Sequence, residues 1–219
     1  MVRTTSDLGF LSSYNVQLVY GDITDRASLL QGMHGCDWII NLAALYSFWT
    51  RDPREYCRIN IEGVQNLMDC ALEAGIDKVV HVSTALIYGK PDEQPFREDS
   101  PIGPERFSEY ARTKYAGDEI AWSLYRKKGL PLVVIYPGGV MGPDHARLGT
   151  NQYISDIIER RIPALGFYDS VLTFVDVRDV AEVIVRAAEK ENNLGARYMA
   201  GKHALTLREY YRKIHDYSG

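Results

Sequence analysis

The feature that most constrains the fold of this chain is a series of short apolar segments that alternate with longer amphipathic ones. Three segments are apolar almost throughout: 37–44, 78–83 and 132–136. Runs of this length and character predict strands that are buried on both faces of a sheet. Helices are predicted over 53–74, which ends at the C-cap Gly75, and over 107–128, which stops at Gly129. Repeated strand-to-helix steps predict an α/β fold with a parallel sheet flanked by helices.

The remaining segments continue this alternation along the chain. They predict, in order, a strand at 16–20, a helix at 25–33, a charged and proline-rich loop at 90–105, a helix at 151–160, a strand at 171–175, a helix at 177–189, a strand at 197–200 and a helix at 207–215. After Pro137 the glycines predict a loop. In sheets of this kind ligands bind beyond the carboxyl ends of the strands, so functional residues are expected just after each strand.

Length and composition exclude several classes of protein. With 219 residues, 46% of them hydrophobic and 25% charged, the chain has the composition of an ordinary soluble globular protein with one domain, or one domain and a small appendage. Its apolar runs are shorter than the ~20 residues that a transmembrane helix needs, and its first residues lack the apolar segment of a signal peptide. The net charge of -4, without a basic patch, argues against nucleic acid as a partner.

Cysteine and histidine usage points to a reducing compartment and away from a metal site. The three cysteines show no C-x-x-C spacing, and an odd number cannot pair completely within the chain. They are interpreted as small buried side chains rather than as nucleophiles or metal ligands. The five histidines form no H-x-H or H-E-x-x-H pattern, so no metal ligands are predicted. We therefore expect a cytoplasmic location.

The pair Tyr110 and Lys114 is the sharpest candidate for chemistry. On a helix, positions i and i+4 share a face, so the phenol and the ammonium point the same way. A phenol with an ordinary pKa of about 10 is a poor acid–base catalyst at neutral pH, and a nearby cation favours the phenolate. The alternative is the ordinary surface of an amphipathic helix. Tyr198 and Lys202 share the spacing, but they fall at a strand end and a turn.

Two further polar groups stand where a parallel sheet would bring them toward Tyr110. Residues 83–89 directly follow a strand, and a hydroxyl there can hydrogen-bond a substrate carbonyl and stabilise charge that develops on its oxygen. Asn60 lies in the helix predicted at 53–74, on a face that is otherwise apolar. A buried amide can order a water molecule or a backbone group; alternatively, Asn60 is a hydrogen-bonded polar residue of the core.

Seven segments of this sequence are similar, in order and spacing, to those of one known family. They are V-Y-G-D-I-T-D (19–25), N-L-A-A (41–44), N-I-E-G-V-Q-N-L (60–67), H-V-S-T-A-L-I-Y-G (81–89), E-Y-A-R-T-K-Y-A-G-D-E (109–119), P-G-G-V-M-G-P (137–143) and F-V-D-V-R-D-V-A (174–181). The chain thus resembles the extended short-chain dehydrogenases/reductases, the superfamily of nucleotide-sugar epimerases and dehydratases, dihydroflavonol reductases and 3β-hydroxysteroid dehydrogenases. The resemblance covers essentially the whole chain, and the segments are jointly very specific.

The resemblance implies catalytic roles for four residues. Tyr110 would be the general acid/base at the reacting oxygen. Lys114 would lower the pKa of Tyr110 and hold the ribose hydroxyls of a nicotinamide cofactor. Thr84 stands at the family's catalytic Ser/Thr position, and Asn60 matches the helix asparagine that supports the proton relay.

The resemblance also implies contacts with NADP or NAD. These are Asp22 and Ile23 beside the adenine, Ala43 and Ala44 on the adenosine ribose and pyrophosphate side, Pro137, Gly138 and Val140 against the nicotinamide, and in addition Arg3, Leu42, Ser83, Tyr110 and Lys114. Arg3 follows a remnant of the family's second strand, where a basic side chain can pair with the 2′-phosphate of NADP. We therefore expect NADP rather than NAD; a solvated surface arginine is the alternative.

The chain departs from the family pattern at both ends. The family's first strand and its G-x-x-G-x-x-G turn, which hold the cofactor pyrophosphate, have no counterpart in this sequence. We therefore expect an internal segment of a longer enzyme, with a Rossmann-like doubly wound parallel sheet that lacks its first β-α unit, and weak or absent nicotinamide binding. Residues 1–141 with 176–200 are expected to form a partial dinucleotide-binding domain, and 142–175 with 201–219 a small, incomplete substrate-binding region.

Two positions bear on the substrate. Tyr136 and Leu172 stand where nucleotide-sugar epimerases commonly carry arginines, which argues against a diphosphate-bearing substrate. Apolar lining is expected from four aromatic residues: Phe48, Trp49, Phe167 and Tyr168. The predicted function is tyrosine-assisted hydride transfer between NAD(P) and a small or hydrophobic ketone or alcohol, in a homodimer expected by analogy. A nucleotide-sugar epimerase or dehydratase and an inactive dinucleotide-binding or relic fragment are the alternatives.

Overall fold

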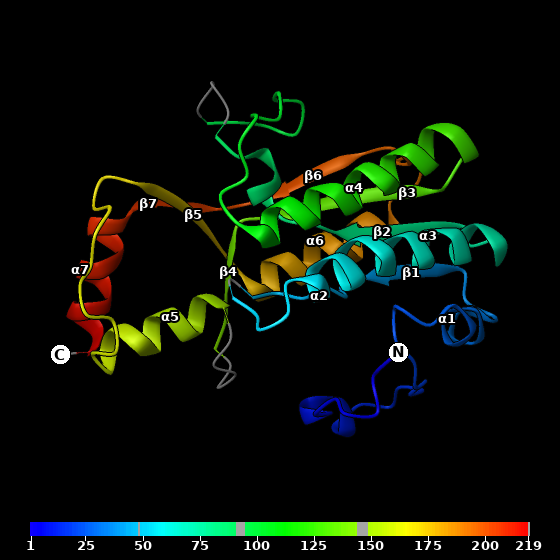
Figure 1. Cartoon of the computed structure of the whole chain (residues 1–219), viewed down its shortest axis with the longest axis horizontal. Coiled ribbons are helices and arrows are strands. Elements are labelled where there is room, and N and C mark those ends of the chain that lie inside the picture. Colours follow the sequence, from blue (N-terminus) through cyan, green and yellow to red (C-terminus); the bar gives the residue numbers. More distant parts are fainter. Residues whose placement is uncertain (48, 91–94, 144–148, 219) are drawn as a thin grey trace.

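The computed structural model describes residues 1–47, 49–90, 95–143 and 149–218 (Figure 1). Its helices are α1 (Arg26–Met33), α2 (Arg54–Cys57), α3 (Val64–Glu73), α4 (Glu109–Lys128), α5 (Gly149–Ile158), α6 (Val177–Glu189) and α7 (Leu207–Ser218). Its strands are β1 (Trp38–Asn41), β2 (Lys78–Val82), β3 (Leu132–Pro137), β4 (Gly139–Met141), β5 (Val171–Asp176), β6 (Arg197–Ala200) and β7 (His203–Thr206). Two short 3-10 helices, η1 (Gly9–Ser13) and η3 (Ala85–Tyr88), and one π-helix, η2 (Arg58–Gly63), complete the described elements.

A parallel four-stranded sheet with the order β1-β2-β3-β6 forms the centre of the molecule. Helices α1, α3 and α4 pack on one face through a large apolar core, and α6 packs on the other face (Figure 1). Strands β2 and β3 are buried almost throughout, as their apolar runs predict. The α/β, Rossmann-like fold with a parallel sheet is therefore confirmed.

Two predictions about the first strands are wrong. The run 37–44 forms a strand only at β1, and Trp38 and Ile40 are exposed instead of buried on both faces. The reason is that β1 is an edge strand, hydrogen-bonded to β2 alone among the described strands. The segment 16–20 forms a single parallel bridge, between Val2 and Tyr20, rather than a strand. Two backbone hydrogen bonds to Val2 hold it there, too few to build a ladder.

A second, three-stranded sheet was not predicted. Its order is β4-β5-β7, with β4 parallel and β7 antiparallel to β5. Strand β4 lies in the glycine-rich segment that predicts a loop, and Gly138, just before it, closely approaches β5. A Cβ at position 138 would lie 2.5 Å from the carbonyl oxygen of Thr173. Helices α5 and α7 pack against this sheet through a separate apolar cluster (Figure 1).

The helix ends follow their capping residues. Gly75 and Gly129 both have positive φ angles, +68° and +70°, which is the conformation expected after a helix C-terminus. The cysteines follow the prediction only in part, because Cys70 is buried whereas Cys57 is half-buried and Cys36 is exposed. Within the described part of the chain, no helix has the length and apolar character that spanning a bilayer requires.

Candidate active site

Helix α4 buries both Tyr110 and Lys114. The Ser108 side chain caps the helix by accepting the N–H of Ala111, so Tyr110 lies in the first turn. The two side chains are 6% and 2% exposed. The Lys114 ammonium donates to the Val82 carbonyl at 3.0 Å, at the carboxyl end of β2. This arrangement excludes the alternative of an ordinary helix surface and points the pair at the sheet edge where parallel sheets bind ligands.

The pKa of Tyr110 is raised, contrary to the expected effect of Lys114. Burial is the main cause, and the charges of Tyr46 and Asp118 add to it. The ring of Tyr46 packs edge-on against that of Tyr110, with the centroids 5.2 Å apart. The Lys114 ammonium is instead engaged by the Val82 carbonyl. A phenol in this environment is protonated at neutral pH, which suits it to donate a proton.

Asn60 lies in the π-helix η2 and is completely buried. Its Oδ1 accepts the N–H of Leu45 at 2.8 Å, and its Nδ2 donates to the Leu45 carbonyl at 3.3 Å and to Thr113 Oγ1 at 3.1 Å. Thr113 precedes Lys114 on α4. The amide therefore orders a backbone segment and ties it to α4. Single π-turns within helices recur at functional sites, whereas the periodicity of 53–74 predicts an uninterrupted helix.

Gly117 allows α4 to lie directly on η2. A Cβ at position 117 would lie 2.3 Å from the carbonyl oxygen of Asn60. Gly63, at the end of η2, has the same role toward Ile23, whose Cγ2 would lie 2.7 Å from an added Cβ. Two glycines thus set how closely the helical layer holds Asn60.

The two hydroxyls that follow β2 have different environments. Thr84 Oγ1 accepts the N–H of Leu86 at 3.3 Å and caps the short helix η3. Ser83 Oγ donates to Asp118 Oδ2 at 2.7 Å. Both side chains are buried. Ser83 is committed to the interior, so Thr84 is the better placed of the two for a ligand beyond the strand.

The expected cofactor residues after β1 lie at an open edge. Leu42 is 64% exposed, Ala43 is exposed and Ala44 is half-buried. The N–H of Ala43 donates to the Oδ1 of Asn41 at 3.1 Å, which fixes the start of this segment.

The expected adenine-side residues lie near the N-terminal segment. The pKa of Asp22 is lowered, chiefly by the hydrogen bonds from the backbone N–H and the hydroxyl of Thr24, at 2.9 and 2.7 Å. The charges of Arg3 and Arg58 lower it further. Ile23 is buried in the core, and Arg3 is exposed. The effect of its charge on the pKa of Asp22 is the evidence that Arg3 lies near the expected adenine-side residues.

The expected nicotinamide-side residues lie where β3 meets β4. Pro137 ends β3 and is buried. Gly138 is half-buried, and its N–H donates to the Ala200 carbonyl at 2.9 Å. Val140, on β4, is partly buried against the core under α6. The sheet thus holds all three residues, of which Gly138 and Val140 are partly exposed.

The residues at this edge fit the nicotinamide and ribose part of NAD(P). The Lys114 ammonium has three N–H donors, and the described acceptor is the Val82 carbonyl alone, so a buried cation retains donors for ribose hydroxyls. The pyrophosphate part is less well provided for, because the sequence has no glycine-rich turn. In the described residues, no three His, Cys, Asp or Glu side chains gather as metal ligands would.

Four residues of this region were missed by the sequence analysis: Asn41, Tyr46, His81 and Asp118. Asp118 follows Lys114 by one helical turn, and this spacing is a signal that could have revealed it. His81 precedes Ser83 by two positions on a strand, so both side chains share a face. Tyr46 lies in an irregular segment, and its contact with Tyr110 has no sequence signal.

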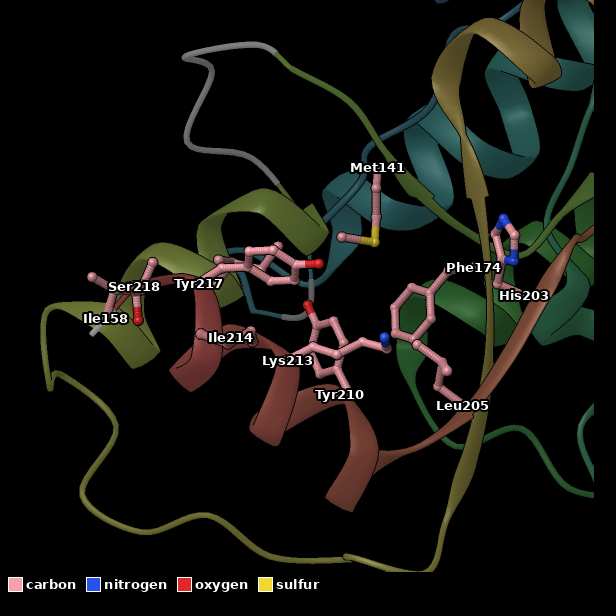
Figure 2. A pocket seen from close by; sticks show the side chains of 11 residues that line it. Met141, Ile158, Phe174, His203, Leu205, Tyr210, Lys213, Ile214, Tyr217 and Ser218 are labelled. Atoms are coloured by element: carbon pink, nitrogen blue, oxygen red, sulfur yellow. The ribbon is translucent and has the colours of Figure 1, made fainter.

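An apolar cavity of about 590 Å³ lies between the three-stranded sheet and helices α5 and α7 (Figure 2). Figure 2 shows side chains of α7 facing Met141 and Phe174 across it. Tyr210 and Lys213 are among the residues that line it. The Tyr210 hydroxyl is buried and has no hydrogen-bond partner in the described structure. The lining of the cavity is mostly apolar.

Of the aromatic residues expected to line the substrate site, the three that the structure describes do not line this cavity. Trp49 and Phe167 are 73% and 86% exposed, and Tyr168 is in contact with the Arg208 guanidinium. Phe48 lies outside the described residues. The cavity draws its lining from β4, β5, β7 and the two helices instead, and a role of the three described aromatic residues at the substrate stays a prediction.

The two positions that lack the arginines of epimerases also differ from each other. Tyr136 is buried in the core, and its hydroxyl accepts the Trp122 indole N–H at 3.2 Å. Leu172 is exposed on β5. Of the two, Leu172 alone faces outward.

The profile of the NAD dependent epimerase/dehydratase family matches residues 2–201. Among curated proteins, the "putative dihydroflavonol 4-reductase" of Synechocystis is 29% identical over 213 residues, which cover 94% of this chain and 61% of that protein. "Sterol demethylase protein B" of Methylococcus capsulatus is 29% identical over 220 residues, which cover 100% of this chain and 66% of that protein. The chain thus spans less than two thirds of the length of these relatives.

Two solved structures are similar to this chain in both fold and sequence. The crystal structure of gox2253 has a TM-score of 0.89 and 29% identity, covering 100% of this chain and 66% of that one. DesIV of Streptomyces venezuelae, a dTDP-glucose 4,6-dehydratase solved with NAD and TYD bound, has a TM-score of 0.82 and 26% identity, covering 96% of this chain and 67% of that one.

Proposed function

Because this chain belongs to the NAD dependent epimerase/dehydratase family, we propose that it carries the catalytic part of an NAD(P)-dependent oxidoreductase. In the proposed reaction, Tyr110 exchanges a proton with the oxygen of a ketone or alcohol. The observation that carries the proposal is the buried pair of Tyr110 and Lys114 at the carboxyl end of β2. The family binds NAD(P), and DesIV was solved with NAD bound.

Four residues of the chain have distinct roles in the proposed reaction. When bound, the nicotinamide supplies or accepts the hydride. Tyr110, whose pKa burial raises, holds the proton that goes to the substrate oxygen in the reductive direction. Thr84 orients that oxygen by a hydrogen bond, and Lys114 holds the ribose. Asn60 fixes the segment at Leu45 against α4.

The apolar cavity supports a hydrophobic ketone or alcohol as the substrate class. Met141, which follows Gly138 by three residues, is one of the residues that line the cavity, and most of the lining is apolar. The exposed Leu172, in place of a cation, offers no partner for a diphosphate.

The nucleotide-sugar epimerase or dehydratase is the second candidate, since it shares the first, tyrosine-assisted hydride transfer. The likeness to DesIV favours it, because that protein is a dTDP-glucose 4,6-dehydratase. As further parts of the proposal, Arg3 favours NADP over NAD, and the helical segments 53–74 and 107–128 form the interface of a homodimer. Residues 1–141 with 176–200 hold the cofactor, and 142–175 with 201–219 face the substrate.

A turnover screen tests the proposal and separates the candidates. The full chain is incubated with millimolar NADPH or NADH and a panel of apolar ketones, and separately with NAD and nucleotide sugars. A reductase oxidises the reduced cofactor in step with alcohol formation, whereas an epimerase converts the sugar with no net change in the cofactor. Calorimetry with NADPH is run in parallel. If neither binding nor turnover is found, the proposed function is wrong and the alternative of an inactive fragment is favoured.

Two variants locate the chemistry in that screen. Tyr110→Phe should lower turnover by about a hundredfold or more, because it removes the proton donor. Tyr115→Phe is the matched control on the same helix, since its ring keeps the contact with Arg106 at 4.2 Å. Equal loss in both variants would contradict the role of Tyr110.

A further inference from the structure

A buried chain of hydrogen-bonded side chains runs from the end of β1 through β2 to α4. Asn41 Nδ2 lies 2.9 Å from His81 Nδ1, and His81 Nε2 lies 3.2 Å from Asp118 Oδ1. Ser83 Oγ donates to the other oxygen of Asp118 at 2.7 Å. All four side chains are at most 6% exposed. We call these residues, Asn41, His81, Ser83 and Asp118, the polar chain.

The direction of each hydrogen bond in the polar chain follows from its first member. The Oδ1 of Asn41 accepts the N–H of Ala43, so its Nδ2 faces His81 as a donor. His81 Nδ1 is therefore the acceptor, which leaves the ring proton on Nε2, where it donates to Asp118. Asp118 thus receives donors on both of its oxygens, as a carboxylate can.

The negative charge at the end of the polar chain lies one helical turn from the buried Lys114. Burial lowers the pKa of Lys114, and the charge of Asp118 raises it. The other titratable groups described around Asp118 are His81 from β2, Tyr110 from α4, Tyr88 from η3 and Tyr136 from β3. Burial lowers the pKa of His81 and raises those of the three tyrosines, so all four are neutral near pH 7. Among these described groups, Asp118 is the one whose charge favours the ammonium form of Lys114.

We propose that Asp118 is a positioning residue that supplies the counter-charge of Lys114 and, through the polar chain, fixes the ends of β1 and β2 against α4. It touches neither substrate nor cofactor. Its effect reaches the edge through Lys114, through Thr84, which follows Ser83, and through Ala43, which is bonded to Asn41. The inference rests on the proposed function for its importance to turnover, but the protonation of Lys114 and the tautomer of His81 are properties of the chain alone.

Nuclear magnetic resonance of the full chain, with lysine isotope-labelled at Cε, tests the counter-charge without cofactor or substrate. Lys114 is assigned from its loss in Lys114→Met. In Asp118→Asn, the Lys114 titration should move down by about one pH unit or more, and Asp118→Glu should restore most of it. A Lys114 titration that is the same in the wild type and in Asp118→Asn would overturn the proposal.

A control variant separates the charge from mere destabilisation. Asn193 is also buried, and its amide donates to the Ala187 carbonyl at 2.8 Å, far along the chain between α6 and β6. Asn193→Ala should lower the unfolding temperature and leave the Lys114 titration in place. If it moves that titration as much as Asp118→Asn does, the effect belongs to stability and the proposal is wrong.

A second test uses the wild-type chain, so it does not depend on whether a variant folds. With isotope-labelled histidine, the imidazole of His81 should carry its proton on Nε2 and should stay neutral below the ordinary pKa of histidine. A proton on Nδ1, or a charged ring near neutral pH, would contradict the hydrogen-bond directions on which the inference stands. If the protein turns over no ketone but gives the expected Lys114 titration and His81 tautomer, the proposed function is wrong and the positioning role of Asp118 stands.

Discussion

Two regions differ in whether their buried polar groups have hydrogen-bond partners. One is the carboxyl end of the four-stranded sheet, and the other is the region of the cavity beside the three-stranded sheet. At the first, the amide of Asn60 and the four residues of the polar chain all have hydrogen-bond partners within the protein. At the second, the Tyr210 hydroxyl is buried without a partner beside about 590 Å³ of space.

The difference indicates which region is organised before a ligand arrives. A fully paired polar network is stiff, and partial loss of it is costly, because the low dielectric of the interior strengthens both effects. The region around the cavity leaves the Tyr210 hydroxyl unpaired, so its buried polar groups are not fully paired. We infer that the proposed proton-transfer geometry is held more rigidly than the region around the cavity.

The largest effect is expected where the rigid region is most crowded. Gly117→Ala places a Cβ 2.3 Å from the Asn60 carbonyl oxygen and must push α4 away from η2. The free energy of unfolding should fall by about 3 kcal/mol. Gly166→Ala is the matched control, because nothing lies within 4 Å of its added Cβ. Urea denaturation of both variants measures the difference, and equal stability would show that the contact between α4 and η2 is loose.

An intermediate effect is expected from the buried His81. Its pKa is lowered by burial, so the folded chain keeps it neutral while the unfolded chain binds a proton below the ordinary value of 6.5. The unfolded state then holds more protons, and stability is lost as the pH falls through that value. This part of the slope amounts to at most about 1.4 kcal/mol per pH unit.

Urea denaturation between pH 5 and pH 7.5 measures this slope in the wild type and in His81→Gln, which has no group that titrates in the window. The slope should be shallower in the variant, whatever its absolute stability. A slope unchanged by the substitution would mean that His81 binds its proton equally well in the folded and the unfolded chain, and the rigid region would then not be organised as described.

The smallest effect is expected at the cavity. Burial raises the pKa of Tyr210 to about 12, so its hydroxyl is a donor without an acceptor. Tyr210→Phe should leave stability unchanged or raise it by about 1 kcal/mol. Tyr211→Phe should lower it by about 1 kcal/mol, because the Tyr211 hydroxyl bonds to Tyr153 and to the Gly166 carbonyl. Thermal unfolding of the two variants checks the order; a large loss in Tyr210→Phe would remove the contrast between the regions.

The sequence predicts the central sheet well and the smaller one poorly. Apolar runs such as 132–136 are long enough to specify buried strands, and the glycine caps specify where helices end. Strand β4 is three residues long and contains a glycine, so its pairing with β5 depends on tertiary contacts that no local pattern carries. The exposure of β1 likewise depends on which strands lie beside it, and periodicity does not record that.

The candidate site divides in the same way. The spacing of Tyr110 and Lys114 predicts that they share a helix face, because this follows from helix geometry alone, whereas their burial is seen only in the structure. The direction of the Tyr110 pKa depends instead on what surrounds the phenol, and Tyr46 arrives from an irregular segment. Asp118 was within reach of the same spacing argument, but its partners on β2 become visible only in three dimensions.

The transfer of deuterium from cofactor to substrate tests the central claim most directly. NADPH that carries deuterium at its transferring carbon is mixed with the full chain and an apolar ketone, and the label in the alcohol is followed by mass spectrometry. At millimolar NADPH, which offsets the weak nicotinamide binding expected from the sequence, we predict labelled alcohol from the wild type, about a hundredfold slower labelling in Tyr110→Phe, and similarly weak NADPH affinity in both. Labelling at the wild-type rate in Tyr110→Phe would contradict the claim.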